Sequence, residues 1–319
     1  MSQPRFNNVR IVVNPAAGRD KPILGPINDV LHPAGVRWDV DITNGPGDAT
    51  ESARRAVADG VDAVGVYGGN GTVAEVAEGL AGSRVPLWIL PGGTGNGTAR
   101  ELGLPRTLKA AARVLIDPGV RVGTIDLGRI GDRVFVLRAG IGAIVEIDRL
   151  ASRKIKDRVG GLAYVSAGLD VLRRVEPSRY RVTVDGKVIQ QSAVACIIAN
   201  GAGFGGIGVL ADGVSMTDGV LDVFLYGSEA LKADLTNLLE NSRPGESGSP
   251  PTPRVGSGRR IRVETDPPQS AVADGETAGD TPIEIEVLPA RLEVILPPGA
   301  EDARALRPLR APRDSRRRR

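Results

Sequence analysis

Two glycine-rich segments carry the residues best suited to chemistry in this chain, and each follows a short apolar run. Residues 67–72 read YGGNGT after the run 63–66, and residues 91–97 read PGGTGNG after the run 87–90. A strand followed by glycines and a helix start presents unpaired backbone N–H groups, which bind phosphate. Two such loops on neighbouring strands predict a nucleotide-binding site.

Acidic residues are concentrated in two further segments. Asp212, Asp218 and Asp222 lie within eleven residues rich in carbonyl groups, and oxygen ligands of this kind are those that Mg²⁺ prefers. Residues 274–276 read Asp-Gly-Glu, which suits either a hairpin turn or a carboxylate acting as a general base. From spacing alone, a turn is the simpler interpretation of the first segment.

Several other kinds of site are excluded or disfavoured. The chain has one histidine, His32, and one cysteine, Cys196, too few for a catalytic triad or a zinc site. Residues 201–206 match the dinucleotide pattern GxGxxG, but residues 207–219 lack the helical period that a dinucleotide site requires. The P-loop pattern GxxxxGK[ST] does not occur.

The predicted secondary structure around these segments changes part-way along the chain, from alternating strands and helices to mostly strands. Strands at 9–13 and 37–42 alternate with helices at 48–58 and after residue 72, which predicts a parallel sheet with ligands beyond the carboxyl ends of its strands. From about residue 121 strand-like runs dominate, with a hairpin at 185–186 and at least one helical insert near 162–175. The Ser-, Pro- and Gly-rich segment 241–258 predicts a loop.

This pattern predicts two domains and a tail. We expect a nucleotide-binding α/β domain over 1–119 and a mostly β domain over 120–298, which contains the two acidic segments. We expect a basic tail over 299–319 that returns to the first domain before it becomes disordered. Aromatic residues make up only 3% of the chain, so its cores must consist mainly of Val, Ile, Leu and Ala, with Cys196 as a buried thiol.

Charge and hydropathy bear on location. The N-terminal residues lack a signal-peptide core, and no apolar run approaches the ~20 residues of a membrane-spanning helix, which predicts a cytoplasmic protein. Net charge is +3, yet residues 304–319 hold eight arginines and a single acid, Asp314. Such a tail is either solvated or attracted to an anionic membrane. Nucleic acid is disfavoured, because no aromatic residues accompany the arginines.

Taken together, the motifs resemble the bacterial diacylglycerol kinase-like lipid kinases, which share their first domain with NAD kinases and sphingosine kinases. The resemblance runs from Val9 to about Pro297. In chain order the matching segments are Asn14-Pro15 with Gly18 (NPxxG), 68–72 with Glu75-Val76 and Gly79-Leu80 (GGDGT-xx-EVxxGL), 91–100 (PxGTxNDxAR), Lys156 with Gly160 and Tyr164, Asn200 with the glycines after it, 211–222 (a metal segment) and 274–276 (DGE).

The resemblance implies an α/β fold, with an N-terminal NAD kinase-like parallel-sheet domain and a mostly antiparallel, β-sandwich-like second domain. It implies ATP between the domains, a structural Mg²⁺ held by Asp218 with backbone oxygens near Ser215 and Val220, and Asp274 or Glu276 as the base that deprotonates a lipid hydroxyl. The implied nucleotide contacts are Asn14, Pro15, Gly18, Thr43, Gly68, Gly69, Asn70, Gly71, Thr72, Gly93, Thr94 and Asn96.

Two positions depart from the family pattern, and both lose an acid. Asn70 stands in GGNGT where the family has Asp, and Gly97 stands where the family's GTxND has Asp. The leading hypothesis is an ATP-dependent kinase of a membrane lipid such as diacylglycerol, peripheral at the inner membrane face. The alternatives are a catalytically impaired relative that binds nucleotide or lipid, and an NAD kinase, which the DGE segment disfavours. Homodimer formation is left open.

Overall fold

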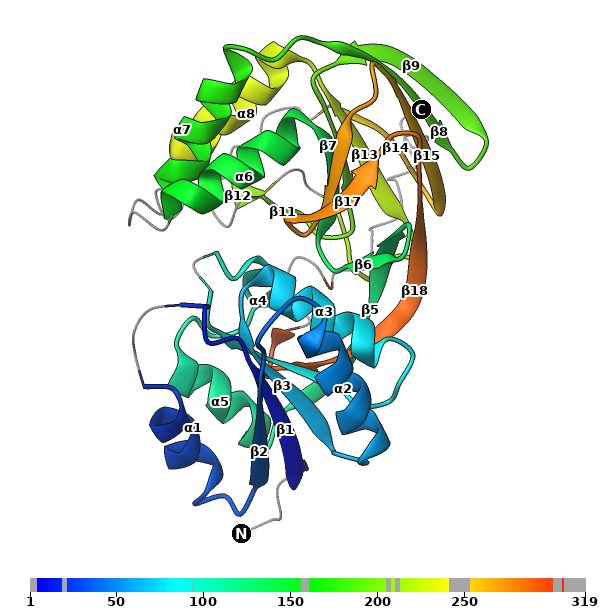
Figure 1. Ribbon diagram of the computed structural model, residues 1–319. Helices are drawn as coiled ribbons and strands as arrows, with labels where there is room; N and C mark the ends of the chain where they lie inside the picture. Colours follow the sequence, from blue (N-terminus) through cyan, green and yellow to red (C-terminus); the bar gives the residue numbers. More distant parts are fainter. Residues whose placement is uncertain are drawn as a thin grey trace, which may run out of the picture.

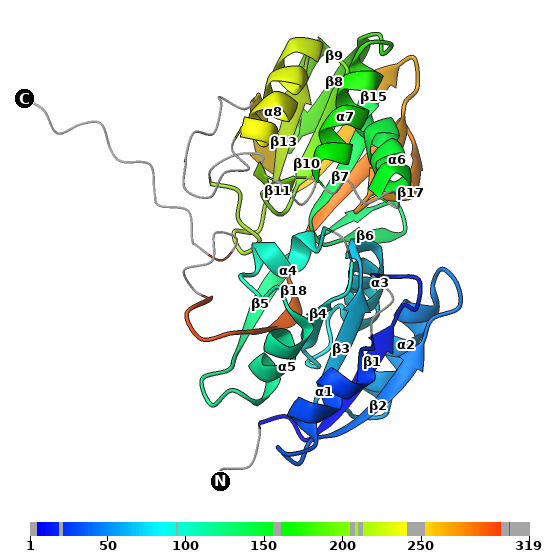
Figure 2. The same ribbon diagram turned by 90° about the vertical axis from the view of Figure 1, so that its left-hand side faces the viewer.

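Four strands of the N-terminal part pair in parallel, as the alternation of strands and helices predicts (Figures 1 and 2). The computed structural model describes residues 5–18, 22–93, 95–155, 161–204, 208–209, 213–240, 253–300 and 306. The parallel strands lie in the order β2 (Arg37–Ile42), β1 (Asn8–Val13), β3 (Ala63–Gly68) and β4 (Leu87–Pro91). Their shared direction brings the segments that follow β1, β3 and β4 to one edge of the sheet.

Helices cover both faces of this parallel sheet (Figure 1). Helices α2 (Asp48–Ala58) and α3 (Asn70–Leu80) pack against one face, around Val12, Val64 and Leu87. Helices α1 (Leu24–Leu31) and α5 (Leu108–Ile116) pack against the other, around Ile11 and Trp88. The apolar positions spaced three and four apart in α3 are buried, as their period predicts. A short helix, α4 (Gly97–Glu101), follows the second glycine segment.

The second part is an antiparallel sandwich. One sheet has the order β14 (Arg254–Gly258), β13 (Leu221–Tyr226), β10 (Ala195–Ala199), β7 (Arg138–Gly142), β16 (Ser270–Ala273) and β17 (Glu276–Asp280). It packs against β18 (Ile283–Leu296), β15 (Arg260–Asp266) and β8 (Ser178–Val184), with β9 (Lys187–Ala193) beyond β8. The shared core buries Tyr180, Val182 and Cys196, so the prediction of a buried thiol is confirmed.

Two sequence expectations need correction or extension here. The segment 241–258, predicted to be a loop, ends in strand β14. This polar strand forms because the edge of β13 at Leu221 and Val223 is open for pairing. Residues 241–252 lie outside the described part. Besides α7 (Gly161–Leu172), which the sequence predicts, α6 (Ala143–Ile155) and α8 (Ser228–Glu240) also cover the outer face of the six-stranded sheet. None of the described helices is long and apolar enough to cross a membrane.

One sheet runs through both parts of the molecule (Figure 1). Strand β18 pairs with β15 near Ile285 and, after a bulge between Leu288 and Leu292, pairs in parallel with β4 at Val294. Strand β5 (Arg121–Ile130) runs antiparallel beside β18 along this whole length and pairs with β6 (Arg133–Phe135). The chain therefore leaves the first domain on β5 and returns to it on β18, and the exact domain boundaries stay a prediction.

The segment after β10 contains no dinucleotide-type helix in its described residues. Strand β11 (Gly203–Phe204) pairs there with β12 (Gly208–Val209). The hairpin expected at 185–186 joins β8 to β9, with positive φ at both Asp185 and Gly186.

Candidate active site between the glycine loops and the acid turn

The loops after β1 and β3 are joined by Asn14. Its backbone N–H donates to the Tyr67 carbonyl at 2.9 Å, and its side-chain amide donates to Thr72 Oγ1 at 3.0 Å. Its own Oδ1 accepts the N–H of Ala16 at 2.9 Å. Asn14 therefore holds the first-turn threonine of α3 beside the end of β1, which explains why an amide is suited to this position.

Close packing joins the same region to the loop after β4. Gly18 has φ +85°, and a Cβ atom added there would lie 2.4 Å from the Gly92 carbonyl oxygen and 2.9 Å from the Tyr67 hydroxyl. Only glycine fits such a close approach at a positive φ. Sequence reasoning missed Tyr67, whose ring lies under Gly92 and whose pKa is raised by burial.

The second glycine loop is fixed by Asn96. Its Oδ1 accepts the N–H of Gly93 at 2.8 Å, and its Nδ2 donates to the Gly93 carbonyl at 2.7 Å. Asn96 has φ +45°, a conformation that asparagine tolerates better than most residues. Thr94, the residue enclosed by this pair of bonds, lies outside the described residues.

Helix α3 begins at Asn70 directly after β3, with Gly69 as the residue before its first turn. Its free N–H groups and the positive end of its dipole suit an anion. Asn70 Oδ1 accepts the N–H of Thr98 at 3.5 Å, a long contact that links α3 to α4. The neighbouring Thr43, at the end of β2, is buried and donates its backbone N–H to the Val13 carbonyl at 3.0 Å.

The turn 274–276, which we call the acid turn, places its two carboxylates differently. Asp274, with φ +46°, accepts backbone N–H groups from Val136 at 2.6 Å, Leu137 at 3.1 Å and Arg138 at 3.0 Å. Burial raises the pKa of Asp274, and these three N–H donors act in the opposite direction. Its oxygens are thus occupied by backbone, whereas Glu276 is exposed.

The acid turn reaches the glycine loop of the other domain. A Cβ atom added at Gly71, in the first turn of α3, would lie 3.1 Å from Glu276 Oε1. The structure therefore brings Glu276 together with the Gly68–Thr72 segment, although more than two hundred residues separate them in the sequence. No local pattern in the sequence could show this contact.

Asp218 lies in different surroundings. Its Oδ1 accepts the N–H of Val220 at 3.1 Å, while its Oδ2 is buried without a hydrogen-bond partner. Burial, together with the charges of Asp222 and Asp126, raises the pKa of Asp218 to about 6. An unpartnered buried carboxylate oxygen fits a cation, because a cation would supply the missing partner.

The other acids of this segment are already engaged. Asp222 is bound by Arg254 at 2.9 Å and by the Ser257 hydroxyl. Asp126, which sequence reasoning missed, accepts the N–H of Gly219 at 2.7 Å and of Ala290 at 2.6 Å. No cluster of three or more His, Cys, Asp or Glu side chains suited to a metal occurs among the described residues. Ser215 and Val220 would therefore have to contribute backbone oxygens.

Asn200, taken from the family pattern, is fully buried and structural. Its amide nitrogen donates to the carbonyls of Asp126 at 2.8 Å and Val136 at 2.7 Å. The strand that carries Asp126 is thereby tied to the backbone that holds Asp274. The matched residues Lys156 and Gly160, and the side chain of Tyr164, lie outside the described part of the chain.

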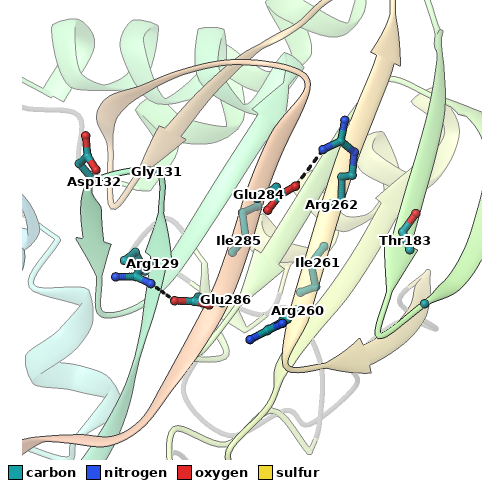
Figure 3. A pocket seen from close by; sticks show the side chains of 11 residues that line it. Arg129, Gly131, Asp132, Thr183, Arg260, Ile261, Arg262, Glu284, Ile285 and Glu286 are labelled. Atoms are coloured by element: carbon teal, nitrogen blue, oxygen red, sulfur yellow. Dashed lines mark hydrogen bonds and ion pairs between the residues drawn. The ribbon is translucent and has the colours of Figure 1, made fainter.

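A hollow of about 560 Å³ lies elsewhere, on the outer face of β5, β18, β15 and β8 (Figure 3). Figure 3 shows Arg129 directed at Glu286 and Arg262 directed at Glu284, and both are ion pairs. The hollow contains none of the predicted site residues, and its two glutamates are already paired. The glycine loops and the acid turn therefore remain the better candidate site.

Comparison with known proteins agrees with this assembly. Residues 8–130 match the diacylglycerol kinase catalytic domain, and residues 136–296 match the YegS C-terminal NAD kinase beta sandwich-like domain. A diacylglycerol kinase of Bacillus subtilis is 31% identical over 298 residues, covering 92% of this chain and 97% of that protein. The chain belongs to the diacylglycerol kinase family.

Further members of the diacylglycerol kinase family resemble the chain over most of its length. One from Mycobacterium tuberculosis is 33% identical over 265 residues, covering 81% of this chain and 84% of that protein. The structure of a Bacillus anthracis diacylglycerol kinase has a TM-score of 0.74 and 29% identity, covering 93% of this chain and 99% of that one. An uncharacterised Synechocystis protein is 34% identical, but the chain spans only 54% of its length.

These relatives confirm the expected fold class, a parallel α/β domain with an antiparallel, sandwich-like second domain. They also confirm the expected enzyme class, a lipid kinase.

Proposed function

We propose that the chain transfers the γ-phosphoryl group of ATP to the hydroxyl of a membrane lipid such as diacylglycerol. The observation that carries this proposal is the contact between Glu276 and Gly71. It places a free carboxylate at the first turn of a helix whose N-terminus suits a phosphate. Phosphoryl transfer needs this combination of positioned phosphate and nearby base.

The nucleotide would bind at the edge formed by β1, β3 and β4. The free N–H groups of the Gly68–Thr72 segment would receive its phosphates, and the loops fixed by Asn14 and Asn96 would enclose them. Pro15, Gly18, Thr43 and Gly93 border the same edge. This arrangement is rigid, because each loop is bound to its neighbour by the hydrogen bonds and close contacts described above.

Glu276 would accept the proton. The lipid oxygen attacks the γ-phosphorus, the bond to the bridging oxygen breaks, ADP leaves, and the hydroxyl proton passes to the Glu276 carboxylate. We assign Asp274 a different task, because its oxygens are occupied by three backbone N–H groups. It holds the turn in the shape that directs Glu276 at α3.

Asp218 would hold a structural Mg²⁺, with backbone oxygens near Ser215 and Val220. The ion would offset the carboxylate charge that accumulates where Asp218, Asp222 and Asp126 lie close together. The lipid acceptor requires the protein to work at a membrane surface, and we propose peripheral association with the inner face of the cytoplasmic membrane.

A catalytically impaired nucleotide- or lipid-binding protein is the second candidate. The observation that favours it is the neutral contact between Asn70 and Gly97, where the family pattern has two acids. Both candidates require nucleotide binding, and they differ in turnover.

A mixed-micelle assay with diacylglycerol and labelled ATP separates the two, with calorimetry measuring nucleotide binding in parallel. We expect turnover by the wild type and a loss of 10²–10⁴-fold in Glu276→Gln, the usual cost of removing a general base. Nucleotide affinity should be retained by that variant. Glu284→Gln, which removes an exposed carboxylate from the outer sheet face, is the matched control. Nucleotide binding without turnover would favour the second candidate.

A further inference from the structure

Leu137 lies at the junction of the two domains, between β6 and β7, and is only 2% exposed. A Cβ atom added at Gly97 would lie 2.9 Å from its Cδ1 atom, and one added at Gly201 would lie 3.0 Å from its Cδ2 atom. Gly97 belongs to α4 in the first domain, whereas Gly201 follows β10 in the second. The side chain of Leu137 therefore occupies the space that a side chain at either position would need.

The backbone of the same residue holds the acid turn. The Leu137 N–H donates to both oxygens of Asp274, at 3.1 and 3.2 Å. Its carbonyl accepts the N–H groups of Asn200 at 2.8 Å and Gly201 at 2.9 Å. The residue that packs on Gly97 is therefore also the residue whose backbone holds Asp274, so a shift of Leu137 as a whole away from Gly97 would move the acid turn with it.

These contacts form a closed chain of residues that links the two domains at two points, Gly71 and Gly97. From Asp274 the turn leads to Glu276, which contacts the first turn of α3 at Gly71. The neighbouring Asn70 lies against Gly97, where a Cβ atom would be 3.1 Å from its Nδ2 atom. Gly97 in turn supports Leu137. The distance between Glu276 and α3 therefore depends on how closely Leu137 packs on Gly97.

We propose that Leu137 is a positioning residue, which sets the distance between Glu276 and the first turn of α3 by packing on Gly97. The inference rests on the proposed function only where it concerns turnover; the positioning itself is a statement about the chain alone. It also accounts for Gly97, because the space that the family's acid would take is filled here by a leucine from the other domain.

The first experiment measures how closely position 276 approaches position 71, without any substrate. In the double variant Gly71→Cys/Glu276→Cys, the sulfur at 276 replaces Cγ, which lies 3.7 Å from the Cβ position at Gly71, close enough for a disulfide after a small shift. Cys196 will not interfere, because it is fully buried and burial raises the pKa of its thiol. The rate of disulfide formation under a fixed oxidant is the readout.

Into this background we introduce Gly97→Ala, Leu137→Ala and the two together. We expect Gly97→Ala to slow disulfide formation by about tenfold, because overpacking a filled contact forces its neighbours apart. Adding Leu137→Ala should restore the rate to within about twofold, because it makes room for the new methyl group. Gly25→Ala in α1 is the matched control, since a Cβ atom there meets nothing within 4 Å.

The second experiment measures turnover in the otherwise unchanged protein. Gly97→Ala should lower kcat about tenfold with the KM for nucleotide retained, and Leu137→Ala should rescue it. Alanine is the better helix former, so poorer helix propensity cannot explain a loss. Thermal melting shows whether each variant folds; if Gly97→Ala does not fold, Leu137→Ala alone must slow disulfide formation and lower kcat.

The outcomes separate the two proposals. Rescue of disulfide formation with an inactive wild type would support the positioning role and overturn the kinase proposal. Two results would overturn the positioning role and leave the kinase proposal standing, provided that the wild type is active. The first is a Gly97→Ala variant with unchanged disulfide formation and unchanged kcat. The second is a Gly97→Ala/Leu137→Ala variant whose rates are no higher than those of the slower single variant.

Discussion

The amide of Asn70 lies within contact of Gly97, so the two positions at which the chain departs from its family's acids are neighbours in space. The pair is therefore a single local change in charge rather than two separate ones. Asn70 is also the first residue of α3, where the positive end of the helix dipole favours a carboxylate. Both facts make position 70 the most informative single substitution in the first domain.

Restoring the acid with Asn70→Asp should raise turnover at limiting Mg²⁺, because a carboxylate holds a divalent cation near phosphates better than an amide does. It should also stabilise the fold by about 0.3–1 kcal/mol, the usual effect of an acid in the first turn of a helix. Turnover over a Mg²⁺ series and urea unfolding measure the two effects. A stabilised variant that binds nucleotide without turnover would point to the impaired relative.

Asp218 should make the stability of the metal-free fold depend on pH. Its folded-state pKa of about 6 lies above the value of about 4 for an unfolded aspartate. The metal-free fold therefore gains stability from the protonated group below about pH 4, and loses this contribution as pH rises through about 6. Asp218→Asn should flatten the melting profile in that window and abolish stabilisation by Mg²⁺ at neutral pH.

The exposed Asp132→Asn is the control for this experiment and should change neither property. An Asp218→Asn profile that follows the wild type, with equal Mg²⁺ stabilisation, would show that position 218 is an ordinary turn residue.

Among the elements, the bulge of β18 has the clearest energetic consequence. Asp126 on β5 accepts N–H groups from Ala290 in that bulge and from Gly219 in the turn before β13. Asp126 is itself buried, and Asp126→Asn keeps its size but replaces one acceptor oxygen by a donor, so one of the two N–H groups loses its charged acceptor. We expect a loss of about 1–3 kcal/mol in the free energy of unfolding, measured in urea.

Asp41→Asn is the matched comparison for that prediction. Asp41 is paired with Arg10 near the surface, at 3.3 Å, and such pairs contribute only about 0–1 kcal/mol. Equal losses in the two variants would show that the Asp126 contacts carry no special weight.

The elements also show where sequence reasoning reached its limit. The helical face of α3 and the hairpin at 185–186 follow from local period and turn chemistry, and both were predictable. The path of β18 was not, because a strand's partner depends on residues far away in sequence. The roles of Asp126 and Leu137 were hidden for the same reason: Asp126 binds Ala290, 164 residues away.

The candidate site divides in the same way. The glycine loops were predictable, because a strand, a glycine run and a helix follow one another directly. That Asp274 is occupied by backbone while Glu276 is free could not be predicted, since both acids occur in one three-residue turn. Only the positions of the N–H groups of 136–138 distinguish them.

At the end of the chain, residues 313–319 hold five of the eight arginines of the tail and lie outside the described residues. Deleting residues 313–319 should weaken binding to anionic vesicles, because each basic residue near such a surface contributes about 1 kcal/mol. High salt should mimic the deletion by screening. Vesicle sedimentation with neutral lipid as the control measures this. Equal binding by the shortened and complete chains at low salt would show that the tail has no part in docking.

The antiparallel pairing of β5 with β18 suggests a way to exchange the second domain. Ile130 lies opposite Ile285, so the chain crosses into that domain and out of it at adjacent points. A short turn grafted between these two residues would close a β-hairpin and leave every strand of the nucleotide-side sheet in place. A different acceptor-binding module could be spliced in at the same two points, with the phosphate-side loops inherited unchanged.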